Sequence, residues 1–113
     1  MRDFKFSYDE SNDDLFIYLP DSKSKGAIEI GNFVFDFDEK EDLVAIQILE
    51  ASRVLSKLVS KIIELAKIKG IKAEIINFRN MAFIKIEIST DSEKETIGMP
   101  IPRIKEKSPA LQY

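Results

Sequence analysis

Alternation of hydrophobic and polar residues predicts a run of short strands in the first half of the chain. The segment Phe4–Tyr8 has the period of two that is typical of a half-buried strand. Clusters of Asp, Asn, Ser, Gly and Pro punctuate the region that follows and mark turns. Between these turns lie four further predicted strands, at Leu15–Leu19, Ala27–Ile30, Phe33–Phe37 and Leu43–Leu49.

Apolar residues then change to spacings of three and four, which predicts one long amphipathic helix. Ser52 is a candidate N-cap at its start, and Gly70 is placed to end it in a left-handed turn. The apolar stripe of this predicted helix consists of Val54, Leu55, Leu58, Val59, Ile62, Ile63, Leu65 and Ala66.

Strand patterns return after Gly70, with a hairpin predicted from Ala73–Phe78 and Ala82–Ser89. Thr96–Ile101 is a candidate edge strand, because prolines at 100 and 102 cannot donate to a strand ladder. We therefore expect an α+β fold over residues 1–113 as a single domain: five strands, one long helix that packs an antiparallel sheet, then two strands and the edge strand over residues 72–104.

The early strands carry apolar side chains on both faces. Phe16 and Tyr18 alternate with Leu15, Ile17 and Leu19, and the segment Leu43–Leu49 is apolar on both sides. One helix covers one face, so either the second half of the chain or a second copy must cover the other. We favour a homodimer, a protein-interaction module whose interface consists of Phe16, Tyr18, Val44, Ile46 and Ile48.

The chain has no cysteine and no histidine, which limits the kinds of catalysis and metal binding that it can support. Thiolate metal sites, cysteine nucleophiles and the usual general base near neutral pH are therefore excluded. We expect a non-enzymatic protein with no cofactor and no catalytic residues. No apolar run approaches the roughly 20 residues that cross a bilayer, and the start does not read as a secretory signal, so we expect a cytoplasmic location.

Two groups of carboxylates are the candidates for chemistry. Asp36 and Asp38 are two residues apart on a predicted strand and could hold Ca²⁺ or Mg²⁺ with the acidic residues that follow; the alternative is an exposed turn that keeps a hairpin soluble. Asp9, Asp13 and Asp14 lie together in the first predicted turn; paired carboxylates can perform acid–base catalysis, but turn formation explains Asp9 and Asp13 without it. A carboxylate- or metal-dependent enzyme centred on Asp36 and Asp38 is the less favoured alternative function.

Charge is distributed unevenly along the chain. Residues 1–50 contain 13 acidic and 5 basic side chains, whereas residues 51–113 contain 7 acidic and 12 basic ones. Arg53, Lys57 and Lys61 repeat every four residues and could meet phosphates, which makes a nucleic-acid-binding protein the alternative function. The net charge of −3 and the lack of a nucleic-acid motif favour a solvated helix face instead.

Two stretches resemble a known family of small prokaryotic proteins. Residues 8–17, YDESNDDLFI, are similar to its Y-D-x-x-x-D-x-L-Y-I opening, and residues 34–52, from VFDFDE to VAIQILEAS, are similar to its V-x-D-x-D-x-x-x-x-V-G-I-E-I-x-x-A-S segment. This is domain-of-unknown-function family 2283, and the resemblance covers about residues 4–58. Ala45 replaces the usual glycine and Gln47 the usual glutamate. The resemblance implies a sheet followed by a helix, no established activity, and antitoxin-like pairing with a small protein.

Overall fold

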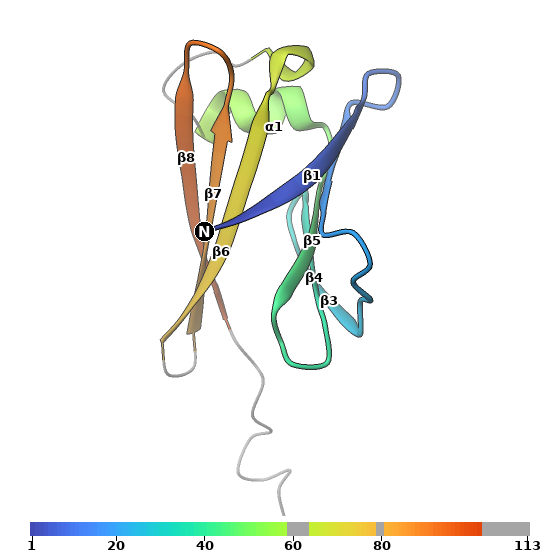
Figure 1. The fold of residues 1–113 in the computed structure, drawn as a ribbon, viewed down its shortest axis with the longest axis vertical. Helices are drawn as coiled ribbons and strands as arrows, with labels where there is room; N and C mark the ends of the chain where they lie inside the picture. Colours follow the sequence, from blue (N-terminus) through green and yellow to red (C-terminus); the bar gives the residue numbers. More distant parts are fainter. Residues whose placement is uncertain (59–63, 79–80, 103–113) are drawn as a thin grey trace, which may run out of the picture.

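The chain folds into one antiparallel sheet that bends into a half-barrel, with a short helix at one end (Figure 1). The structure is a computed structural model and describes residues 1–58, 64–78 and 81–102. Within them the strands are β1 (Arg2–Asp9), β2 (Asp14–Tyr18), β3 (Gly26–Ile30), β4 (Phe33–Phe37), β5 (Leu43–Ile48), β6 (Gly70–Phe78), β7 (Met81–Ser89) and β8 (Lys94–Pro102), and the helices are α1 (Ala51–Leu58) and the 3-10 turn η1 (Leu65–Lys67).

Strand β1 joins the two halves of the sheet, whose order is β3-β4-β5-β2-β1-β6-β7-β8. Its first residues, Arg2–Phe4, pair with β6, and its later residues, Lys5–Asp9, pair with β2. No residue of β1 is paired on both sides in this register, so the two halves diverge from the crossing point. Figure 1 shows β1 running diagonally between them.

The two halves face each other and bury one apolar core between them. Ile17, Phe35 and Ile46 come from the β2–β5 half, and Ile84 and Ile86 come from the β6–β8 half; all five are fully buried in the same cluster. Leu55 of α1 joins this cluster. Among the described residues, no polar or charged residue is buried. The second half of the chain therefore covers the inner face of the first.

The prediction of a sheet packed by one long helix is wrong. Within the described residues helix α1 covers only Ala51–Leu58, and Leu65–Lys67 forms only a single 3-10 turn. Ile68 is already extended, and Gly70 begins β6 opposite Ser89 rather than ending a helix. Leu65 and Ile68 are buried, so their apolar spacing marks core positions reached without a continuous helix. Val59, Ile62 and Ile63 of the predicted stripe lie outside the described residues.

The predicted strands are found, with bounds that differ by a few residues. The segment Phe33–Phe37 is β4 with unchanged bounds, and the predicted edge strand is β8, which lies at one edge of the sheet. The α+β label fits only in part, since strands dominate and a second sheet layer, rather than a helix, provides the cover.

Candidate functional site

The carboxylate of Asp13 connects the first turn to the start of α1. The Tyr8 hydroxyl donates to Asp13 Oδ1 at 2.6 Å, and the Ser52 hydroxyl donates to Asp13 Oδ2 at 2.7 Å. The backbone amide of Ser52 donates to both carboxylate oxygens, at 3.1 and 3.2 Å. The Asp13 carbonyl oxygen accepts from the Ala51 amide at 2.7 Å. Asp13 therefore satisfies helix amides that have no partner within the first turn.

This geometry corrects the prediction that Ser52 is the N-cap. The first bond of α1 runs from the Val54 amide to the Glu50 carbonyl, so Ser52 lies inside the first turn. A side chain 39 residues away supplies the cap, and Asp13 adopts a left-handed backbone conformation with φ of 56°. An aspartate tolerates that conformation better than most residues do.

The same contacts set the electrostatics of the cluster. Hydrogen bonds from Tyr8 and Ser52 hold the pKa of the Asp13 carboxyl below its usual value. The bond to Asp13, with burial adding to it, raises the pKa of Tyr8 to about 12. Since its oxygens already accept four bonds, the Asp13 carboxylate is placed to anchor the helix rather than to take a proton from a substrate.

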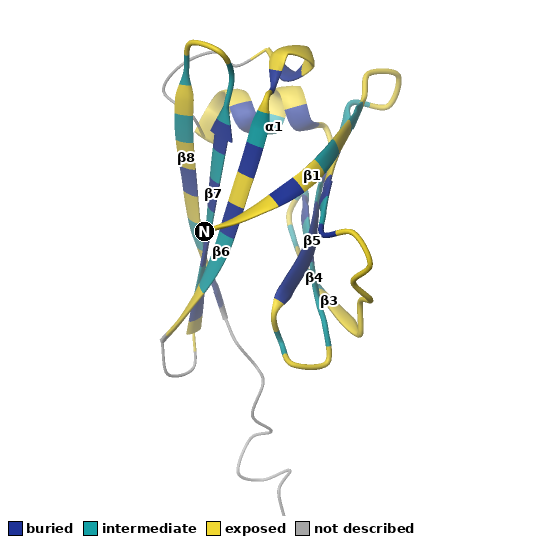
Figure 2. Ribbon diagram, in the orientation of Figure 1, coloured by how far each residue is buried: buried dark blue, intermediate teal, exposed yellow. Residues whose placement is uncertain are grey.

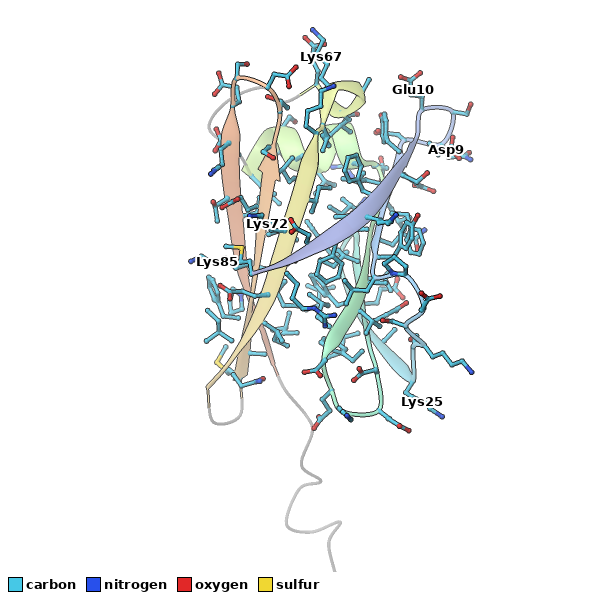
Figure 3. All side chains as sticks on the ribbon, in the orientation of Figure 1. Asp9, Glu10, Lys25, Lys67, Lys72 and Lys85 are labelled. Carbon is cyan, nitrogen blue, oxygen red and sulfur yellow. The ribbon has the colours of Figure 1, made fainter. Side chains whose placement is uncertain are left out.

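Other carboxylates of the two acidic groups are engaged in turns. Asp9 accepts from the Ser11 and Asn12 amides and from the Asn12 side chain, and these bonds lower the pKa of its carboxyl. Figure 3 shows Asp9 and Glu10 at the tip of the β1–β2 turn, away from the body of the molecule. Asp14 lies opposite Asp9 in the β1–β2 ladder.

The two residues predicted to bind a metal have different surroundings. Asp38 Oδ1 accepts from the amides of Lys40 and Asp42, both at 2.9 Å, within the loop after β4. Asp36 lies in β4 opposite Ala27 and Ala45. Across the described ranges, no three acidic, histidine or cysteine side chains gather as a metal site would require. A metal at Asp36 and Asp38 stays a prediction.

The predicted cationic stripe is split in the structure. Arg53 donates from Nε and Nη2 to the two carboxylate oxygens of Glu50, at 3.2 and 3.0 Å. This pair raises the pKa of Arg53 and lowers that of Glu50. Lys57 is exposed in α1, and Lys61 lies outside the described residues. One of the three cations is thus committed to a neighbouring carboxylate, which weakens the stripe as a phosphate-binding surface.

An open cavity of about 370 Å³ lies beside the N-terminal end of β1. Phe4, Leu43 and Ile75 contribute apolar surface, and its charged side chains are of both signs, from Arg2 and from acidic residues. The volume lies at the low end of the range for small-molecule sites, and its lining includes no hydroxyl side chain.

The outer face of the β1–β5 half carries an exposed aromatic pair. Phe16 and Tyr18 of β2 stack with ring centroids 5.1 Å apart and an interplanar angle of 18°. Phe16 is 44% exposed, although β2 has a neighbouring strand on each side. Ala45 is the cross-strand neighbour of Tyr18 and lies on the same face. It is 8% exposed and does not belong to the core cluster.

Register places two rows of side chains across this outer face. Cross-strand partners point to the same side of a sheet, so each row can be followed from β1 to β3. The first row is Lys5, Tyr18, Ala45, Asp36 and Ala27, and the second row is Ser7, Phe16, Gln47, Val34 and Glu29.

Three of the five predicted interface residues face the opposite way. Ile46 and Ile48 pair with Ile17 and Leu15 on the inner face and are fully buried in the core. Val44 is also in the core, at a register shift in which β4 residues Asp36 and Phe37 oppose Ala45 and Leu43. These three residues cannot contact a partner, because the β6–β8 half covers them; β5 is dark blue along most of its length in Figure 2. Phe16 and Tyr18 remain available.

Comparison with known proteins finds a family that resembles the first half of the chain. Residues 5–52 match the family described as "Protein of unknown function (DUF2283)". We refer to residues 5–52, which are similar to this family, as the DUF2283 segment. The resemblance stated from the sequence for about residues 4–58 is therefore confirmed.

Two relatives share this region. An uncharacterized protein of Methanocaldococcus jannaschii is 40% identical over 52 residues, which is 46% of this chain and 45% of the relative. A Methanosarcina mazei protein named "Putative hypoxanthine phosphoribosyltransferase" is 35% identical over 48 residues, which is 42% of this chain and 39% of the relative. The chain thus spans less than half the length of either relative. No solved structure matches.

The DUF2283 segment coincides with a structural unit. It contains most of β1 and all of β2 to β5, and it ends at Ser52, the residue whose amide and hydroxyl bind Asp13. The sequence did not predict that Tyr8, Asp13 and Ser52 are in contact. All three residues lie in the two stretches that resemble the family, and this was the one feature of the sequence that pointed to them as a group. No helix in the described ranges is long and apolar enough to span a membrane.

Proposed function

We propose that this chain is a non-enzymatic, cytoplasmic protein-interaction module, and that two copies pair through the outer face of the DUF2283 segment. The observation that carries the proposal is the stacked pair Phe16–Tyr18, with Phe16 44% exposed on a strand that has neighbours on both sides. Aromatic side chains that are exposed in the middle of a sheet face are typical of contact surfaces rather than of solvated ones.

The strength expected of such a pair follows from the exposed area. A phenylalanine side chain buries about 150–250 Å², so covering the exposed 44% of Phe16 removes about 90 Å² from water and contributes about 2 kcal/mol per copy. The two rows of side chains cover five strands about 4.8 Å apart and three residues of each, or roughly 200 Å² of sheet. A contact this small belongs to the weak, reversible class of interfaces.

Support for a non-enzymatic role comes from the hydrogen bonds that the candidate catalytic carboxylates accept. Asp9 and Asp38 accept backbone amides within their own turns, and Asp13 binds the start of α1. These bonds stabilise local structure and leave the carboxylates poorly placed for proton transfer to a substrate.

Sedimentation velocity over concentrations up to about 1 mM tests the proposal, since weak dimers form only there. We expect the wild-type chain to dimerise and Phe16→Thr to remain monomeric. Met81→Thr is the matched control, because Met81 is 45% exposed but lies in β7 of the other half. A wild-type chain that stays monomeric throughout, or equal effects of the two substitutions, would refute pairing through this face. Capture of a small toxin-like protein on the same face, lost in Phe16→Thr, would replace the second copy with that partner.

A further inference from the structure

The outer face has an internal order that indicates how two copies would meet. In the first row, a cation stands at the β1 end and an anion at the β4 end, with Tyr18 and Ala45 between them. Lys5 is exposed and Asp36 is half-buried, and within the described residues neither forms an ion pair. Lys5 and Asp36 are three strand spacings apart, about 14 Å, so they cannot satisfy each other within one copy.

A twofold axis parallel to the strands, placed over the boundary between β2 and β5, relates this row to itself in reverse. Such a rotation keeps positions along the strands and exchanges the two sides of the face. Lys5 then meets Asp36 of the second copy, and Tyr18 meets Ala45 of the second copy. The face is therefore complementary to itself in charge and in side-chain size, as an interface with twofold symmetry requires.

The second row is compatible with the same axis. Phe16 lies over Gln47 of the second copy, and Ser7 lies over Val34. No like charges meet in either row under this rotation. A twofold axis that lies across the strands would instead place each strand over the same strand of the second copy. Lys5 would then lie on the side of the interface where Lys5 of the second copy also lies.

We propose that the second copy binds with the strand-parallel twofold axis and that two Lys5–Asp36 pairs set this register. The inference rests on the proposed self-association and specifies its geometry. Each pair forms at the edge of an apolar contact, where partial desolvation makes it stronger than an isolated surface pair. The two pairs select one orientation among those that Phe16 and Tyr18 alone would permit.

Charge exchange tests the register. In Lys5→Glu both pairs become Glu–Asp, and in Asp36→Lys both become Lys–Lys, so each variant alone should dimerise at least about tenfold more weakly than wild type. An equimolar mixture of the two variants should recover the wild-type affinity. Its heterodimer contains one pair of opposite charges between the two introduced side chains and one unaltered pair between Asp36 and Lys5. The double variant Lys5→Glu/Asp36→Lys should recover the affinity as well.

Lys69→Glu is the control, because Lys69 is an exposed lysine that precedes β6 on the other half of the molecule. Thermal melts of all variants establish that each is folded. If the exchange variants dimerise as well as Lys69→Glu does, or if the mixture fails to recover the affinity, the register is wrong even though Phe16→Thr still abolishes dimerisation. A wild-type chain that is monomeric at about 1 mM overturns the proposed function together with the register.

Discussion

Replacing Asp13 should destabilise the fold far more than its position in a turn suggests. In Asp13→Ala, the Tyr8 hydroxyl and the Ser52 amide and hydroxyl lose their acceptor. Loss of a helix cap costs about 0.5–2 kcal/mol, and a further bond to a charged group adds about 1 kcal/mol once its exposure to solvent is considered. Alanine at a φ of 56° adds about 1 kcal/mol of backbone strain. We therefore expect the free energy of unfolding to fall by about 3 kcal/mol.

Asp21 provides a matched control, because it has a similar backbone conformation with φ of 64° and lies exposed in the loop after β2. Asp21→Ala carries the backbone strain without the loss of a cap, so we expect a decrease of about 1 kcal/mol. Urea unfolding followed by circular dichroism measures both variants. Equal losses in the two variants would show that the cap contributes nothing and would refute the reasoning.

The pH dependence of Asp13 gives a second measurement on the same cluster. The pKa of its carboxyl is lower in the folded state than in the unfolded chain, so its stabilising effect is present above the unfolded value, near 4, and is lost as the pH falls through the folded value. Asp13→Asn should differ most from wild type at neutral pH and converge with it in acid. A constant difference across this range would contradict the assigned role of the charge.

Two other predictions concern single side chains. The pKa of Tyr8 is raised from 10.0 to about 12, so between these values the folded state retains a proton that the unfolded chain loses. The free energy of unfolding of the wild type should therefore fall as the pH rises from 10 towards 12. Tyr8→Phe should remove this decrease in urea titrations at alkaline pH. Ile46→Ala should cost about 2–5 kcal/mol in the free energy of unfolding, because Ile46 is fully buried in the core. A loss below about 1 kcal/mol in the monomer would mean that Ile46 lies on a surface after all.

Strand positions could be predicted from the sequence because a period of two is a local property. Phe33–Phe37 and the β7 segment, with Ile84, Ile86 and Ile88 on one side, alternate over part of their length, and their predicted bounds are nearly correct. The prediction of a long helix was wrong because the structure of that segment depends on nonlocal contacts. Leu65 and Ile68 keep the spacing of a helical stripe, yet tertiary contacts bury them from a 3-10 turn and an extended residue.

The interface prediction failed in part because alternation identifies two faces without saying which one is inside. Ile46 and Phe16 were assigned to a common surface, but register places Phe16 opposite Gln47 and Ile46 opposite Ile17. That pairing depends on the hydrogen-bond ladder between β2 and β5, which no local pattern encodes. The contact from Asp13 to Ser52 is likewise nonlocal, since it requires the β1–β2 turn and the start of α1 to meet at one end of the sheet.

The divided pairing of β1 has a consequence for the order of folding during synthesis. The DUF2283 segment emerges from the ribosome before β6 does, and its part of β1 can pair with β2 as soon as both are available. Arg2–Phe4 must wait for β6, whose partner residue Ile71 is made much later. Arg2–Phe4 are thus among the last residues of the sheet to be ordered, and this long-range closure should set the rate of the final folding step.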